Sequence, residues 1–399
     1  MKIGQRWPEN EMQECKVIFS RALSTILILT LCISTIAEVA KAGLGHGKGA
    51  DTDVFSEEQP TISGVTVSTN SFSPKNEQAV EISYTLSKAA KVSLKIFDFD
   101  DCLARTICLE KPVEAGKQNE SWDGKDEKGG IVPDEAYYFT IEAEDSDGDK
   151  YLYDPTTSWK MEVCELKASR YRNSEKEYTY EIPEMARVLI RLGIHKGPML
   201  KTLVDWEPRL AGENIEYWNG MDESNLFELW NNNKFSSRIS YKGFPENTII
   251  SYGNYDTDIK EYKLATMRCC EEKEARDLAG DEERGVFPGF LKTRVYEKSP
   301  KVVLELPAFK DVDTPVLSGK TIVRVDVGEL DKRIIQEQQF EISFFIDQEF
   351  FTEEEQGYFP YNWQWDLSEL HEGEHILTVN VASFRGLVGT ASRKVIVRK

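Results

Sequence analysis

Two stretches of the sequence, AGKQNESWDGKDE at Ala115–Glu127 and AGENIEYWNGMDE at Ala211–Glu223, align with each other without a gap. The second begins 96 residues after the first, and the two share an Ala-Gly start, a glutamate, a tryptophan, and a closing Gly, Asp and Glu. Such a repeat indicates either a duplicated functional site or a duplicated fold. The residues around the two stretches distinguish these explanations.

The repeat extends upstream, because residues 89–116 align without a gap on residues 185–212. Each segment has an alternating apolar stretch, a turn, a second apolar stretch, a proline and then Ala-Gly. The alternating apolar positions are Val92, Leu94 and Ile96 in the first copy and Val188, Ile190 and Leu192 in the second. Period-two alternation is typical of half-buried antiparallel strands, and the repeat length suits one β-sandwich domain. We therefore interpret the repeat as a duplicated fold.

Similar alternating stretches, separated by Gly, Pro and Asp turns, continue to the C-terminus. The sequence therefore predicts an all-β chain of tandem Ig-like antiparallel β-sandwiches, with an N-terminal signal peptide and a short charged insert that is compatible with a helix. The expected segments are a signal peptide at 1–42, a flexible stalk at 43–60, sandwiches at 61–165 and 166–258, the charged insert at 259–298, and a third sandwich at 299–399.

The N-terminus has the features of a secretory leader. Lys16 and Arg21 precede an apolar run at 24–37, and Ala40–Ala42 offers small residues for cleavage. The run is shorter than the roughly 20 residues that a spanning helix needs. We expect a secreted, extracellular or periplasmic bacterial protein, with an uncleaved anchor as the alternative.

The chain is strongly acidic, with 69 Asp and Glu residues against 49 Lys and Arg residues and a net charge of −20. Nucleic-acid binding depends on basic side chains that neutralise phosphates, so a nucleic-acid partner is disfavoured. Anionic membrane surfaces are disfavoured for the same reason. We expect a protein partner at the cell envelope or outside the cell, or a glycan.

The first copy resembles the C-terminal Ig-like domain of flagellar hook-capping proteins. Its stretch AGKQNESWDGKDEKGGIVPDEAYYFTIEAEDSDG at 115–148 follows that family's pattern, although Glu135 stands where the pattern has a glycine. The second copy follows the pattern as far as Asp222, and GEHILTVNVASFRGLVG at 373–389 resembles bacterial Ig-like domains more generally. The resemblance implies an Ig-like module and not a hook cap, because this chain has a leader and three sandwiches.

In that family the Trp-Asp-Gly motif is structural. We expect each tryptophan to fill a sandwich core, the following Asp or Asn to accept backbone N–H groups, and the glycine to supply an unusual backbone angle. The motif residues are Trp122, Asp123, Gly124 and Asp126 in the first copy, Trp218, Asn219, Gly220 and Asp222 in the second, and Trp365 and Asp366 in the third.

No motif in the sequence indicates a reaction. The chain has four histidines, and no serine or cysteine lies in a nucleophile-elbow or papain-like context. His371 and His375 have helical spacing but lead into a predicted strand, which disfavours a zinc site. We therefore expect a non-catalytic protein with no catalytic residues and no cofactor.

Two weaker hypotheses concern a metal and a disulfide. Asp145, Asp147 and Asp149 alternate as the first ligands of a calcium loop do, and the alternative is a polar turn. Cys102 and Cys108 are expected on either side of a hairpin turn, where they could form a disulfide.

The stretch FFTEEEQGYFPYNWQW at 350–365 interleaves aromatic residues with three glutamates. Gly357 and Pro360 favour an irregular loop. We expect Tyr358, Tyr361 and Trp363 to be exposed and to contact a partner or a glycan.

The expected function is therefore a non-catalytic secreted or cell-surface scaffold or binding protein. The alternatives are a carbohydrate-binding module, or an accessory subunit of an extracellular enzyme or appendage. Exposed coplanar rings would favour sugar, and a flat apolar patch would favour protein.

Overall fold

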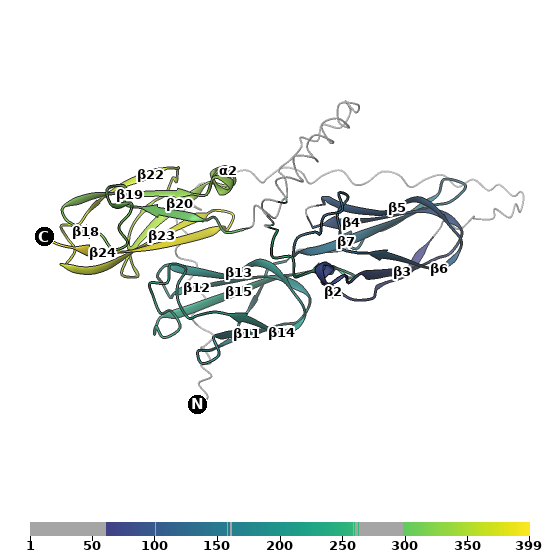
Figure 1. Cartoon of the computed structure of the whole chain (residues 1–399), viewed down its shortest axis with the longest axis horizontal. Coiled ribbons are helices and arrows are strands. Elements are labelled where there is room, and N and C mark those ends of the chain that lie inside the picture. The colour runs from purple at the N-terminus through teal and green to yellow at the C-terminus, as the bar shows by residue number, and fades with distance from the viewer. Residues whose placement is uncertain are drawn as a thin grey trace, which may run out of the picture. The chain divides into compact units, whose positions relative to one another are not determined.

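The computed structural model describes residues 61–399 except 100, 158, 160–161, 258, 260–261 and 263–297. The expected signal peptide, the stalk and most of the charged insert lie outside the described residues. The described part forms Ig-like antiparallel β-sandwiches with three separate apolar cores (Figure 1). The predicted all-β fold is confirmed.

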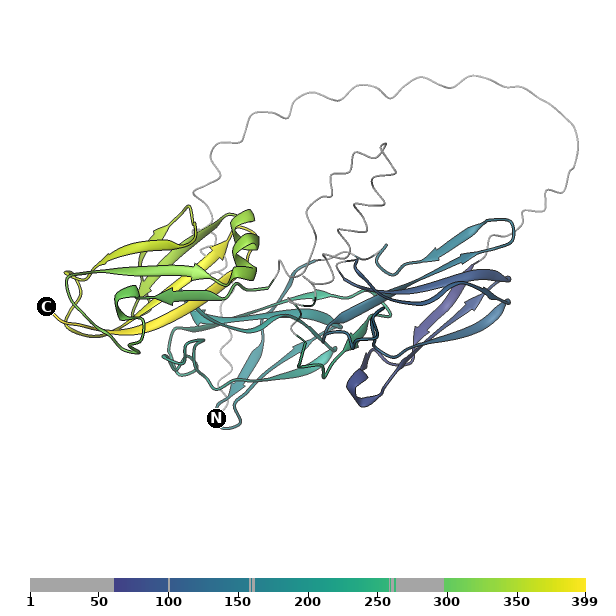
Figure 2. The same cartoon turned by 45° about the horizontal axis from the view of Figure 1, so that its top comes forward.

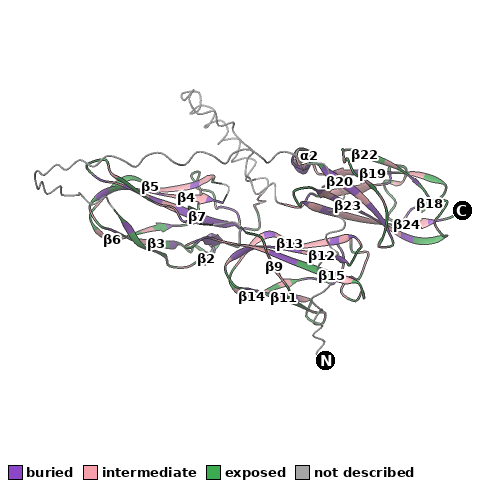
Figure 3. Ribbon diagram, turned by 180° about the vertical axis from the view of Figure 1, so that it is seen from behind, coloured by how far each residue is buried: buried purple, intermediate pink, exposed green. Residues whose placement is uncertain are grey.

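The first sandwich packs the sheet β1-β3-β6 on the sheet β2-β16-β7-β4-β5, and β8 also pairs with β7. Side chains alternate between core and solvent along these strands, as Figure 3 shows by burial. The bounds are β1 Ile62–Val67, β2 Ser71–Phe72, the 3-10 helix η2 Pro74–Asn76, β3 Val80–Leu86, β4 Ala90–Asp98, β5 Leu103–Val113, β6 Gly116–Trp122, β7 Ala136–Glu144, β8 Lys150–Tyr153 and β16 Ile249–Ser251.

The second sandwich packs the sheet β10-β11-β14 on the sheet β13-β12-β15-β9. The hairpin β12–β13 followed by β14 in the other sheet repeats the hairpin β4–β5 followed by β6, so the sequence repeat corresponds to a repeated strand order. The bounds are β9 Cys164–Leu166, β10 Ser169–Arg172, β11 Glu177–Ile182, β12 Ala186–Ile194, β13 Met199–Arg209, β14 Gly212–Tyr217 and β15 Phe235–Gly243.

The third sandwich packs the sheet β17-β19-β22 on the sheet β18-β24-β23-β20-β21, and the two layers are visible in Figure 2. The sequence did not predict its helix α2, which buries Ile334 and Ile335 and whose Asp331 accepts a hydrogen bond from the backbone N–H of Lys301 at 2.8 Å. The bounds are β17 Val302–Glu305, the 3-10 helix η4 Pro307–Phe309, β18 Val316–Leu317, β19 Lys320–Val327, α2 Glu329–Glu337, β20 Phe340–Ile346, β21 Glu349–Glu354, β22 Tyr361–Asp366, β23 Gly373–Ser383 and β24 Val388–Val397.

The short strand β16 shows that the first two sandwiches are not simply consecutive. β8 pairs with the end of β7, where Lys150 faces Glu144, and β16 pairs with its start, where Ile249 faces Tyr137. Both strands are antiparallel to β7, so β16 continues the line of β8 along the same edge. Residues 154–248 between them contain the second sandwich. That sandwich is therefore an insertion in the last strand of the first, and the range 166–258 expected for it includes a strand of its neighbour.

The backbone N–H groups of residues 250–252 donate hydrogen bonds to the first sandwich. The N–H of Ile250 donates to Asn70 O at 2.8 Å, that of Ser251 to Glu135 O at 2.9 Å, and that of Tyr252 to Phe72 O at 3.1 Å. Ile249 is fully buried in the first core. Thus β16 completes this core although it follows the second sandwich in sequence.

A buried ion pair joins the first two sandwiches beside β16. The side chains of Glu135 and Arg187 are only 3% and 2% exposed and form an ion pair through Glu135 Oε1 and Arg187 Nη2. Arg187 Nη1 also donates to the carbonyl oxygen of Trp206 at 3.2 Å. Glu135 is the residue that departs from the hook-cap pattern, and the residue aligned with Arg187 in the first copy is the exposed Lys91. A departure from the family pattern and a difference between the two copies therefore meet at this junction.

An aromatic cluster covers the same junction. Phe99 of the first sandwich contacts Phe244, which follows β15 of the second, with ring centroids 5.0 Å apart, and Tyr138 packs against Phe99 in the same cluster. The indole N–H of Trp159 donates to the carbonyl oxygen of Gly243 at 2.9 Å. The junction thus combines apolar burial with a paired charge.

Replacing Glu135 by alanine should lower the free energy of unfolding by about 3–5 kcal/mol, because it leaves the Arg187 guanidinium buried without its carboxylate. The double change Glu135→Leu and Arg187→Met removes both charges and should cost much less than the sum of the single changes Glu135→Leu and Arg187→Met. Urea titrations of Glu135→Ala, of these two single variants and of the double variant measure these costs. Strictly additive costs would mean that the two side chains do not depend on each other.

Candidate functional site

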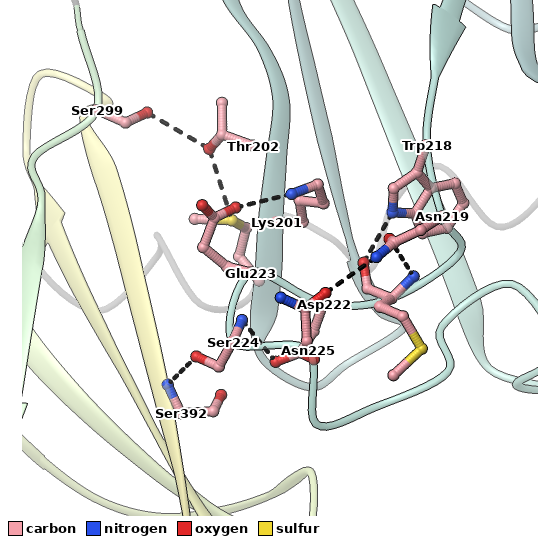
Figure 4. A network of polar contacts seen from close by, with 12 residues as sticks. Lys201, Thr202, Trp218, Asn219, Asp222, Glu223, Ser224, Asn225, Ser299 and Ser392 are labelled. Carbon is pink, nitrogen blue, oxygen red and sulfur yellow. Dashed lines mark hydrogen bonds and ion pairs between the residues drawn. The ribbon is translucent and has the colours of Figure 1, made fainter. Parts of the chain in front are cut away.

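The duplicated Trp-Asp-Gly turn has the same geometry in the first two sandwiches. The indole N–H of Trp122 donates to the carbonyl oxygen of Lys125 at 3.1 Å, and that of Trp218 to the carbonyl oxygen of Met221 at 2.7 Å. Both rings are buried. Figure 4 shows the second turn, where Asn219 Oδ1 accepts the N–H of Met221 at 3.0 Å. Each tryptophan therefore fixes the turn that follows it as well as filling a core.

The acidic residues of the two turns bind the backbone. Asp126 Oδ1 accepts the N–H groups of Lys128 and Gly130, each at 2.9 Å. The carboxylate of Asp222 accepts the N–H groups of the three loop residues Ser224, Leu226 and Phe227. A carboxylate bonded to the backbone in this way holds its turn in place, as expected of a structural motif.

Backbone conformation and close packing both require glycine at these two positions of the motif. Gly124 has a φ of 73° and Gly220 a φ of 83°, a region that side chains disfavour. A Cβ atom on Gly124 would lie 2.2 Å from Pro74 Cγ, and one on Gly220 would lie 2.5 Å from Trp230 Cδ1. The close contact in each turn leaves no room for a side chain at the glycine position.

The third copy of the motif is incomplete. Trp365 is fully buried, and Asp366 Oδ1 accepts the N–H of Ser368 at 3.0 Å, as its counterparts do. Leu367 replaces the glycine, however, and the indole Nε1 of Trp365 is buried without a hydrogen-bond partner among the described residues. This tryptophan fills the core but does not fix the turn.

Substitution of each tryptophan by phenylalanine should therefore have unequal costs. Trp122→Phe and Trp218→Phe each leave a turn carbonyl without its donor, whereas Trp365→Phe removes an N–H that is already unpaired and costly to bury. We expect Trp365→Phe to destabilise its sandwich by at least about 1 kcal/mol less than the other two, as measured by urea unfolding. Equal costs for all three variants would contradict this assignment.

The acidic turn after β7 does not form the calcium site that its spacing suggested. Asp145 Oδ1 accepts the backbone N–H groups of Asp147 and Asp149 at 3.0 and 2.9 Å, and its other oxygen forms an ion pair with Lys88. The hydrogen bond with Lys88 holds the pKa of Asp145 below its usual value. No group of three acidic, histidine or cysteine side chains among the described residues is placed to hold a metal ion. The carboxylate that the hypothesis assigned to calcium is thus paired with Lys88.

The predicted disulfide is wrong because both cysteines lie on the same side of the hairpin turn. Cys102 directly precedes β5 and Cys108 lies within it, opposite Leu94 of β4. Six extended residues span roughly 20 Å, which is far beyond the Cα separation of a disulfide. The Cys108 thiol instead donates to Val92 O at 3.6 Å, and burial raises its pKa.

The aromatic stretch of the third sandwich is more regular than expected. Glu353 lies in strand β21 and Tyr361 and Trp363 lie in β22, so only residues 355–360 form the expected loop. Tyr361 and Trp363 pack against the third core, and the ring of Trp363 lies 4.5 Å from that of Phe344. The expectation that these two rings are exposed is wrong. Alternate residues of a strand share a face, so both point inward with the buried Trp365.

The exposed rings in this region are different ones. Phe350 and Phe351 of β21 are 55% and 39% exposed, and Tyr358 in the loop is 56% exposed. β21 is the edge strand of its sheet. The sequence stretch contained both phenylalanines, but alternation alone did not indicate that an edge strand would leave them uncovered. We call Phe350, Phe351 and Tyr358 the aromatic edge.

The surroundings of the aromatic edge are acidic. Glu353 and Glu355 are exposed, and Glu341 lies on the neighbouring strand β20. Burial, together with repulsion from Glu353 and Glu355, raises the pKa of Glu341. A cationic group placed here would relieve that repulsion.

The histidine pair noted in the sequence is held within the third sandwich. His375 is buried, with Nδ1 2.6 Å from Asp347 Oδ2 and Nε2 3.0 Å from the carbonyl oxygen of His371. Both neighbours are acceptors, which suits a doubly protonated ring. Burial lowers the pKa of His375, but the hydrogen bonds to Asp347 and His371 outweigh it and raise the pKa above its usual value of 6.5.

This raised pKa makes the stability of the third sandwich depend on pH. Because the folded-state pKa lies above the unfolded one, the contribution of His375 is fully present below about pH 6.5 and is lost as the pH rises through the folded value. We expect the melting temperature to fall between about pH 6 and pH 8 more in the wild type than in His375→Gln. Identical pH profiles in a calorimetric scan would refute this.

The second and third sandwiches also contact each other through polar groups. The side-chain amide of Asn380 accepts the N–H of Met199 at 2.9 Å and donates to its carbonyl oxygen at 2.7 Å. Figure 4 shows the N–H of Ser392 donating to Ser224 Oγ at 2.9 Å, beside the turn that Trp218 fixes. These pairs could not be predicted from the sequence, because nothing in a strand pattern identifies its neighbour across a domain boundary.

Residues 69–147 match the family model for the FlgD Ig-like domain. The first sandwich is therefore an Ig-like domain of the FlgD type, as the sequence resemblance predicted. Among solved structures, FlgD from P. aeruginosa is 28% identical, and the match covers 22% of this chain and 67% of that chain with a TM-score of 0.19.

Two other solved structures are similar over most of the chain. A tetra-tandem repeat from the extending region of a large adhesion protein is 10% identical and covers 85% of this chain and 74% of that chain, with a TM-score of 0.19. The Bacteroides ovatus mixed-linkage glucan protein SGBP-B, solved with a mixed-linkage heptasaccharide, is 11% identical and covers 86% and 71%, with a TM-score of 0.17. TM-scores this low carry no argument about ligands. No curated protein matches the chain.

Among the residues that the structure describes, no helix combines the length and the apolar character needed to cross a membrane. The apolar run at 24–37 lies outside this part of the chain.

Proposed function

We propose that this chain is a non-catalytic secreted or cell-surface scaffold that presents the aromatic edge of its third sandwich to a protein partner. The observation that carries the proposal is the exposure of Phe350 and Phe351, consecutive residues of the edge strand β21 whose rings contact Phe345 and Trp363 respectively. Edge strands are usually protected by charges or by short length, because they expose unpaired backbone groups. An edge strand that also exposes two adjacent phenylalanines is suited to pairing with an extended segment of another protein.

The charge around the aromatic edge favours a protein over a neutral sugar. The glutamates around the aromatic edge favour a partner segment that carries basic side chains.

A hydrogen bond and an ion pair join the start of β21 to the second sandwich, which supports the scaffold role. The amide of Asn232 donates to Gln348 Oε1 at 3.0 Å, and Lys234 pairs with Glu349 at 3.0 Å. Binding residues that lie on a rigid support lose less conformational entropy when a partner arrives.

Phe350→Ser should abolish capture of a partner from the native cell envelope while changing the melting temperature by no more than about a degree or two, since exposed substitutions usually cost under about 0.5 kcal/mol. Phe384→Ser is the matched control, because Phe384 is 63% exposed on the same sandwich but lies between β23 and β24. Pull-down with mass spectrometry compares the captured proteins.

Equal capture by both variants would contradict a role for the aromatic edge. Binding on a glycan array that Phe350→Ser removes would replace the protein partner by a carbohydrate.

A further inference from the structure

We propose that this chain is built to carry tension between its two ends, with the first and third sandwiches in the line of force and the second sandwich shielded from it. The inference does not depend on which partner the aromatic edge binds. It rests on how an early strand of the first and of the third sandwich pairs with the last strand of the same sandwich, whereas the described strands of the second sandwich include no such pair.

In the first sandwich, the early strand β2 lies parallel to the closing strand β16, with Ser71 facing Ile250. Two hydrogen bonds join them, from Ile250 N to Asn70 O at 2.8 Å and from Tyr252 N to Phe72 O at 3.1 Å. The chain comes to β2 from the N-terminal side and leaves β16 toward the C-terminus. A pull on the two ends therefore draws the parallel strands past each other along their length.

Strands loaded along their length must break their hydrogen bonds together, whereas strands pulled apart sideways break them one at a time. The force needed to open a domain follows the barrier to that concerted step and not its equilibrium stability. A parallel pairing of an early strand with the last strand is therefore the arrangement that resists a pull on the chain ends.

The third sandwich has the same pairing. β18 lies parallel to the last strand β24, with Val316 facing Ile396. Ile396 N donates to Pro315 O and Arg398 N donates to Leu317 O, each at 2.9 Å. In both sandwiches, alternate N–H groups of the last strand donate to alternate carbonyl oxygens near the first. We call each such pairing a terminal clamp.

The second sandwich lacks a terminal clamp. Its β9 pairs antiparallel with β15, and among its described strands no parallel pair occurs. It does not need one, because both of its ends are anchored on the same edge of β7, through β8 and β16. Along the backbone, a pull on the ends of the chain reaches residues 154–248 only after β16 has left β7. The two sandwiches with terminal clamps are the two that a pull loads directly.

Stretching single molecules of the full chain by its two ends tests this proposal. Tyr252→Pro removes the N–H that donates to Phe72 O, and Tyr252→Ala removes only the ring. Arg398→Pro and Arg398→Ala are the corresponding pair in the third sandwich and remain informative if Tyr252→Pro does not fold. We expect each proline variant to open its sandwich at a lower force than its alanine partner.

Shielding of the second sandwich is tested by Trp218→Ala, which weakens its core. Residues 154–248 should add their extension, about 330 Å at roughly 3.5 Å per residue, only after the first sandwich has opened. Proline variants that open at the same force as their alanine partners would overturn the proposal. An early extension of about 330 Å in Trp218→Ala, before the other sandwiches open, would overturn it as well.

Discussion

The first sandwich is completed by the three residues of β16, which follow the whole second sandwich in the sequence. Without β16, the start of β7 would lack a partner on that edge and Ile249 would be missing from the core. Unpaired buried backbone groups are costly, so the first fold is incomplete until residues about 180 positions away return to it. One such long-range contact is the hydrogen bond from the side chain of Asn70 to Thr248 O, 178 positions later in the chain. The insertion of the second sandwich, the junction and the terminal clamp of the first sandwich all follow from this closure.

The ion pair between Glu135 and Arg187 shows how the junction constrains the sequence. Burying two charges is costly unless each satisfies the other, so such a pair specifies which surfaces meet more than it adds stability. Glu135 is the residue at which the first sandwich departs from its family pattern, and Arg187 differs from its counterpart Lys91. Both members of this buried pair are thus positions that differ from a pattern, Glu135 from the family and Arg187 from the first copy.

The features that sequence reasoning predicted depend on local periodicity and turn chemistry. The alternating strands and the buried Trp122, Trp218 and Trp365 are of this kind. The expectation for Tyr361 and Trp363 failed although the signal was present, because residues two apart from a core tryptophan share its face. The disulfide prediction was wrong because the turn between β4 and β5 precedes both Cys102 and Cys108. The pairing of β16 could not be predicted, since two isoleucines and a serine do not indicate which of two sheets they join.

Hydrogen exchange of residues 249–254 in mild denaturant is the most direct test of the closure. The N–H groups of residues 250–254 donate to the first sandwich, including those of Gly253 and Asn254 to the carboxylate of Asp134. In Trp122→Ala, these amides should lose protection together with β4 and β7 while β12 and β15 stay protected. In Trp218→Ala, β12 and β15 should exchange first and residues 249–254 should stay protected. Exchange of residues 249–254 together with β12 and β15 in Trp218→Ala would show that β16 belongs to the second sandwich and would contradict the account.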